Sequence, residues 1–135
     1  ANTGSAKEHY EAGIKASFEA WGTQGNYETY VKDKAAFNNT LEQIMTQKWI
    51  ASWSASTEAW FDYRRTGLPA LKAGPAAVRS ALPLRFYYMQ DELTINEKNA
   101  SAAVSKLETT QFSQSDENNS AWSKFWLLQG TGKPW

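Results

Sequence analysis

Two amphipathic segments, 40–53 and 56–67, limit the fold most strongly because so few residues separate them. Apolar residues recur every three or four positions in the first segment, as they do on one face of a helix, and Thr40 suits its N-cap. The second segment should end at Gly67, because Pro69 cannot continue a helix. Only a tight turn fits between the segments, so we expect an antiparallel helical hairpin.

The segment before this hairpin, residues 6–21, predicts another amphipathic helix. Its apolar residues are spaced four, four, four and three apart, and Ser5 with Glu8 has the pattern of a capping box. Gly22 is a suitable stop for this helix. Residues 22–34 contain no apolar stripe of this kind and are interpreted as a loop or short irregular stretch.

The second half of the chain is more irregular. Glycine and proline interrupt residues 67–90, so long helices are not expected there, and 85–89 suits a short strand or an extended segment. Residues 91–108 suggest one helical turn followed by a helix, 113–120 a polar loop, and 120–126 a last short helix. The expected fold is therefore mainly α, built from helical hairpins with long irregular connections rich in Pro and Gly, and with few or no strands.

Composition excludes several classes of function. The 135 residues suit one domain, so 1–135 is expected to be a single unit. Fourteen basic residues balance fourteen acidic ones, which argues against a nucleic-acid partner, and the lack of cysteine excludes a thiolate zinc site.

No apolar run approaches the ~20 residues that span a bilayer. The chain begins at Ala1 without a methionine, so we expect it to be cut from a longer protein.

Charged and aromatic residues concentrate in the stretch "EAWFDYRR" at 58–65. On a helix, Glu58, Asp62 and Arg65 share one face. Trp60 and Arg64 are four residues apart, which permits a cation–π contact. We interpret the stretch as a structural corner. A glycosidase pair of Glu58 and Asp62 is disfavoured because the arginines would keep both carboxyls ionised.

Other candidate sites are weak. His9 is the only histidine, and the "GTGK" near the end lacks the first glycine and the final Ser or Thr of a phosphate-binding loop. Six tryptophans lie on predicted apolar faces and are assigned to the core: Trp21, Trp49, Trp53, Trp60, Trp122 and Trp126. Tyr27, Tyr30 and Trp135 have no such place, so they are the candidates for stacking on a sugar ring.

The stretch "QKWIASWSASTEAWFDYRRTGLPAL" resembles the C-terminal region of the SusD/RagB family of outer-membrane lipoproteins. The later stretch "LPLRFYYMQDELTIN" is similar to another block of that family, although Met89 stands where the family usually has proline. The residues that carry the likeness as structural motifs are Trp49, Glu58, Trp60, Asp62, Arg64, Arg65, Gly67, Pro69, Arg85, Tyr88, Glu92 and Asn96.

The resemblance implies the C-terminal part of a larger, tetratricopeptide-like helical protein. Such a protein is held at the cell surface on the outer membrane by a lipid anchor outside this segment. It binds glycan or another nutrient and passes it to a TonB-dependent outer-membrane transporter, without catalysis or a cofactor. The partners implied are the glycan, the transporter and the rest of the same chain. The alternatives are a stand-alone helical protein-interaction module and, less favoured, a small hydrolase.

Overall fold

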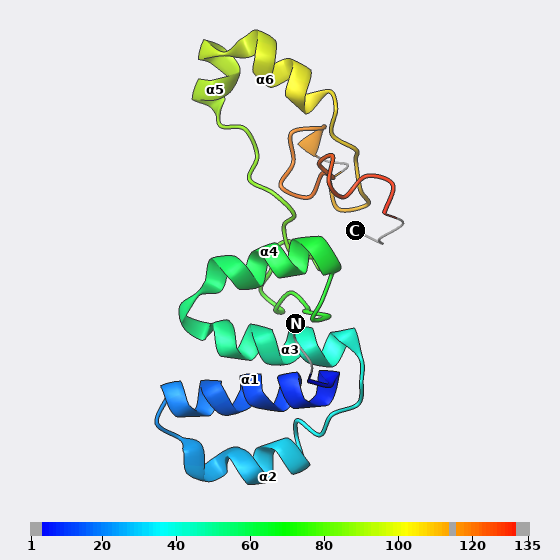
Figure 1. Ribbon diagram of the computed structural model, residues 1–135. Coiled ribbons are helices and arrows are strands. Elements are labelled where there is room, and N and C mark those ends of the chain that lie inside the picture. The colour runs from blue at the N-terminus through cyan, green and yellow to red at the C-terminus, as the bar shows by residue number, and fades with distance from the viewer. Residues whose placement is uncertain (1–3, 114–115, 132–135) are drawn as a thin grey trace. The chain divides into compact units, whose positions relative to one another are not determined.

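The computed structural model describes residues 4–113 and 116–131 (Figure 1). The chain forms two compact units, 1–70 and 71–135, and each is described by itself. The elements are α1 (Ala6–Ala20), η1 (Gln24–Asn26), α2 (Tyr27–Lys32), α3 (Leu41–Ala51), η2 (Ser52–Ser54), α4 (Ser56–Thr66), α5 (Gln90–Ile95) and α6 (Glu97–Val104). The described residues include no strand, only one isolated β-bridge, so the expected mainly α fold is confirmed. The single unit expected over 1–135 stays a prediction.

The four α-helices of the first unit lie one above another in the order α2, α1, α3, α4, and α3 and α4 run in opposite directions (Figure 1). Local signals set their ends. Ser5 and Glu8 form the expected capping box, and the Thr40 hydroxyl accepts a hydrogen bond from the Gln43 N–H at 3.2 Å. Gly67 ends α4 in the left-handed conformation, with φ of 73°. The antiparallel hairpin predicted for α3 and α4 is therefore present.

The core of the first unit lies where α1 meets the segment that follows it. Tyr10, Ile14 and Ala35 are buried together, and four aromatic side chains pack around them: Phe18, Tyr27, Tyr30 and Phe37. The interpretation of residues 22–34 as a loop was wrong, because this segment contains η1 and α2. Its tyrosines pack against α1, so tertiary contacts stabilise a helix too short to form alone.

Most of the tryptophans assigned to the core are not buried. Trp53 is 82% and Trp126 78% exposed, and Trp21 and Trp49 are exposed as well, as is Phe61 of α4. Only Trp60 and Trp122 are partly buried. In the first unit the other side chains are exposed because the helices form a single layer. Each α-helix contacts only one or two others, so part of its apolar surface stays uncovered. An apolar stripe predicts which face of a helix packs against the protein, but it does not predict which element covers that face.

The second unit combines a helical pair with an irregular C-terminal segment. α5 and α6 contact each other, and Glu108 bridges to Lys124. The short helix expected over 120–126 is absent, and turns take its place. The Ser123 hydroxyl donates to the Asn118 carbonyl at 2.8 Å, and such local side-chain bonds compete with a helix.

Two glycines of the first unit should respond in opposite ways to alanine. Gly13 lies within α1, and a Cβ added there meets nothing within 4 Å, so Gly13→Ala should stabilise the protein by about 0.5–1 kcal/mol. Gly67 has φ of 73°, so Gly67→Ala should destabilise it by about 1–2 kcal/mol. Urea unfolding of the full-length protein measures both changes. Equal effects of the two substitutions would contradict the described backbone.

Candidate ligand-binding groove

A groove runs along the surface between α1 and α3. Its inner part is a hollow of about 450 Å³, and its walls are mainly aliphatic and aromatic. The lining residues include Tyr10, Ile14, Phe18, Ile44 and Ile50. Ligand pockets of this kind are typically concave, largely apolar and roughly 300–1,000 Å³ in volume. The groove is therefore suited to hold a ligand.

The outer end of the groove lies between two exposed tryptophans. Trp21 and Trp53 line the same open hollow of about 430 Å³, together with Ser17, Phe18, Thr23 and Ile50. Trp21 is the C-cap residue of α1, and Trp53 lies in the 3₁₀ turn η2 that follows α3. The sequence assigned both rings to the core. Their exposure at one hollow instead gives the groove a pair of flat aromatic surfaces.

Tyr27 and Tyr30, the sugar-stacking candidates from the sequence, do not project from a loop. Both lie on α2 and pack against the core of the first unit. The Tyr27 hydroxyl donates to the Glu11 carbonyl at 3.4 Å, and the Tyr30 hydroxyl donates to Gln47 Oε1 at 3.0 Å. Tyr30 also lines the inner hollow. These rings were chosen because the sequence placed them in a loop, and the structure corrects that expectation. Trp135 lies outside the described residues.

Removal of the two tyrosine hydroxyls should affect stability more than ligand binding. Because each hydroxyl bonds within the unit, Tyr27→Phe and Tyr30→Phe should each cost about 0.5–1.5 kcal/mol of unfolding free energy. Glycan affinity of the full-length protein, measured by calorimetry, should stay within about two-fold for Tyr27→Phe. A large loss of affinity at unchanged stability would restore Tyr27 as a ligand contact.

The charged residues of α4 connect it to α3, as a structural corner requires. Asp62 forms an ion pair with Lys48 of α3 at 2.5 Å and another with Arg65 at 2.9 Å. The contact with Lys48, and after it the contact with Arg65, holds the pKa of Asp62 below its usual value. Glu58 is exposed. The predicted pair of Asp62 and Arg65 is present, whereas the partnership with Lys48 was missed because it joins two helices.

Arg64 makes the cation–π contact that its spacing predicts. Its guanidinium carbon lies 4.4 Å from the centre of the Trp60 ring and 5.9 Å from that of Phe61. Burial lowers the pKa of Arg64. Gly67 and Pro69, which follow it, are both buried. These residues cover the C-terminal end of α4, and they form no open ligand-binding site there.

The motif residues of the second unit form two separate local contacts. Arg85 is buried, donates to the Ser120 carbonyl at 3.0 Å, and stacks 4.9 Å from the centre of the Tyr88 ring. Burial lowers the pKa of Arg85. Asn96 donates to Glu92 Oε1 at 2.6 Å across the end of α5. Both contacts join parts of the second unit to one another.

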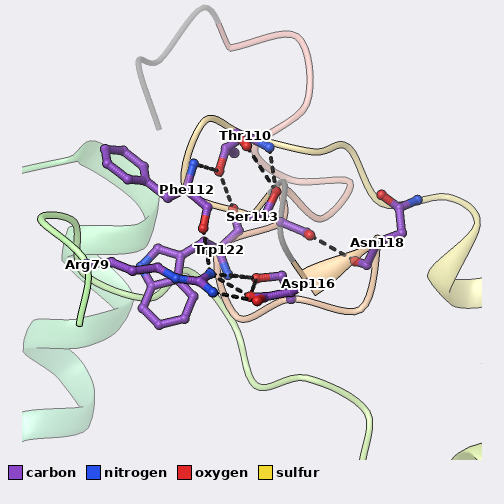
Figure 2. Close-up of polar contacts among 9 residues, drawn as sticks. Arg79, Thr110, Phe112, Ser113, Asp116, Asn118 and Trp122 are labelled. Atoms are coloured by element: carbon purple, nitrogen blue, oxygen red, sulfur yellow. Dashed lines mark hydrogen bonds and ion pairs between the residues drawn. The ribbon is translucent and has the colours of Figure 1, made fainter.

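A further polar cluster of the second unit, shown in Figure 2, was not anticipated. Arg79 binds both carboxylate oxygens of Asp116, and its guanidinium lies 4.1 Å from the centre of the Trp122 ring. The hydrogen bonds that Arg79 donates to the Asp116 carboxylate raise the pKa of Arg79. Asp116 lies in the polar loop expected over 113–120, and its side chain is 31% exposed. No sequence signal joins residues 79 and 116.

The residues that the structure describes contain neither a cluster suited to a metal ion nor a membrane-spanning helix. Among them, no group of three or more His, Cys, Asp or Glu side chains is placed to hold a metal ion. Within the same residues, no helix is long and apolar enough to cross a membrane. Together, the stacked helices of the first unit and the uncharged aromatic end of the groove offer a surface suited to binding a ligand.

The chain belongs to the SusD-like family. Residues 2–89 match the family model described as "Starch-binding associating with outer membrane". The motif residues of α3 and α4 lie inside this range. The family is thus described by what it binds and by its association with the outer membrane, not by a reaction. A search of curated proteins finds no match.

Two solved structures are similar to the chain. One is titled "Bacteroidetes AC2a SusD-like", with a TM-score of 0.73 and 24% identity over 93% of this chain, and it supports the fold. The other is titled a chitin-binding protein, with a TM-score of 0.61 and 34% identity over 90% of this chain. The match covers 26% of each of those proteins, so the chain spans about a quarter of their length.

Proposed function

We propose that this chain is part of a SusD-like lipoprotein of the cell surface that binds a glycan and delivers it to a TonB-dependent outer-membrane transporter. The observation that carries the proposal is the family match over residues 2–89, whose description joins starch binding to the outer membrane. The similarity to a chitin-binding protein supports a polysaccharide ligand. The lipid anchor, the transporter and the larger chain follow from the resemblance of the motifs.

The role we propose is binding without catalysis. Lys48 and Arg65 keep Asp62 ionised, so its carboxyl does not serve as a general acid. Glu58, the other carboxyl considered from the sequence, is exposed on α4. In this proposal the motif residues support the fold of a larger protein, and binding energy comes from surfaces such as the groove.

Glycan binding is tested with the full-length protein. Affinity electrophoresis in gels that contain soluble starch, and sedimentation with chitin particles, should show retardation or retention with at least one polysaccharide. Bovine serum albumin serves as the non-binding control. Equal mobility in gels with and without starch, together with no retention on chitin, would contradict the proposed ligand class.

Delivery to the transporter needs a separate test. Tagged full-length protein, isolated from outer membranes in mild detergent, should bring with it a channel protein of the TonB-dependent class. The alternative, a stand-alone helical interaction module, is favoured by the exposed apolar groove of the first unit. Recovery of the protein in soluble complexes, without a membrane channel, would support that alternative.

A further inference from the structure

We propose that the outer end of the groove, between Trp21 and Trp53, is a subsite for a pyranose ring of an oligosaccharide. This inference rests on the proposed glycan-binding function and assigns it to particular residues. It differs from the expectation for Tyr27 and Tyr30, whose rings pack into the first unit. The two tryptophans instead line one open hollow of about 430 Å³.

The exposure of the two rings suits a sugar. A pyranose has a face of C–H groups that packs against an aromatic ring, and the indole offers the largest such surface among the side chains. Both rings are attached to ordered backbone. The Trp21 N–H donates to the Ser17 carbonyl at 3.2 Å, and the turn that carries Trp53 is closed by a bond from the Ala55 N–H to the Ser52 carbonyl at 2.8 Å. Backbone that is already fixed loses little conformational entropy when a ligand binds.

The polar groups of the hollow favour a neutral, hydroxylated ligand. Ser17 and Thr23 line it, and each hydroxyl can both donate and accept a hydrogen bond. None of the described residues that line this hollow is charged. An anionic headgroup or an acidic peptide would find no counter-charge there, whereas an oligosaccharide needs none. An apolar helix would suit the inner hollow better, because aliphatic and aromatic side chains together form most of its walls.

The groove continues from this subsite, which suits a ligand of more than one sugar. An adjoining hollow of about 490 Å³ shares Ser17 and Trp21 with the outer one. Its lining also includes Gly13 and Ala51, which are small. A Cβ at Gly13 would meet nothing within 4 Å, so the groove is open above α1. The next sugar of a chain could therefore lie along α1 towards the inner hollow.

The test uses the full-length protein with maltoheptaose and chitohexaose as probes. Oxidative labelling followed by mass spectrometry should modify Trp21 and Trp53 in the free protein, and one oligosaccharide should protect both. The double variant Trp21→Ala, Trp53→Ala should lose at least ten-fold in affinity for that oligosaccharide by calorimetry. The matched control is Trp126→Ala, an exposed tryptophan of the second unit, which should keep wild-type affinity.

Each contrary outcome has a distinct meaning. If both rings are shielded from labelling in the ligand-free protein, another part of the protein covers them and the subsite is overturned. If the wild type binds an oligosaccharide while the rings stay labelled and the double variant keeps its affinity, the subsite is overturned and the proposed function stands. If the wild type binds neither probe nor either polysaccharide, the proposed function fails, and the subsite fails with it.

Discussion

Replacement of Asp62 with alanine should lower the free energy of unfolding by about 1–2 kcal/mol, because it removes the ionic link between α3 and α4. The Asp62 side chain is 14% exposed, but its partners Lys48 and Arg65 are solvated, which limits the loss. Denaturant unfolding of the full-length protein measures the change. The control is Glu58→Ala on the exposed part of the same helix, which should shift stability by less than ~0.5 kcal/mol. Equal losses of stability for Asp62→Ala and Glu58→Ala would argue against a structural role for the charged residues of α4.

The contribution of Asp62 should also depend on pH in a defined direction. The ion pairs with Lys48 and Arg65 place its folded-state pKa below the ordinary value of 3.8. The folded protein then binds the proton less readily than the unfolded chain does. The stabilisation is therefore complete above that ordinary value and is lost as the pH falls through the folded-state pKa. The difference in stability between wild type and Asp62→Asn should shrink on acidification. A difference that grows in acid would contradict this assignment.

Replacement of Leu84 with alanine should have the largest effect, a loss of about 2–5 kcal/mol of unfolding free energy. Leu84 is 1% exposed, and its N–H donates to the Ala121 carbonyl at 2.8 Å, so it anchors the irregular segment of the second unit. The cavity left by the missing side chain adds to the lost transfer energy. The change is measured as the unfolding midpoint and as faster amide exchange within 84–128. Val78→Ala, at a side chain 93% exposed, should leave both unchanged.

The helices could be predicted because their signals are local. Ser5, Thr40 and Gly67 lie next to the helix ends they set, and each forms the expected cap in the structure. Arg64 and Trp60 were paired correctly for the same reason, since a helix fixes the separation of residues four apart. Features that depend only on residues close in the sequence, such as helix caps and i, i+4 pairs, were therefore predicted correctly.

The candidate site depended on contacts between distant segments, and there the sequence was a poor guide. The apolar stripes predict that Trp21 and Trp53 are buried, but the arrangement of the helices decides whether another element covers them. Tyr30 was misplaced for the converse reason, because its hydroxyl partner, Gln47, belongs to another helix. The ion pair between Arg79 and Asp116 joins two stretches that sequence reasoning treated separately as loops.

The side chain of Asn119 has a consequence for self-association. Its amide accepts from the Tyr88 N–H at 2.8 Å and donates to the Tyr88 carbonyl at 2.8 Å, as the backbone of a neighbouring strand would do. The extended stretch around Tyr88 carries the exposed side chains Phe86, Tyr87 and Met89, a composition that makes an open strand edge prone to aggregation. Because the amide occupies both backbone groups of Tyr88, a strand from a second molecule cannot pair at this residue. The Asn119 amide thus blocks strand pairing at Tyr88, within a stretch that exposes several apolar side chains.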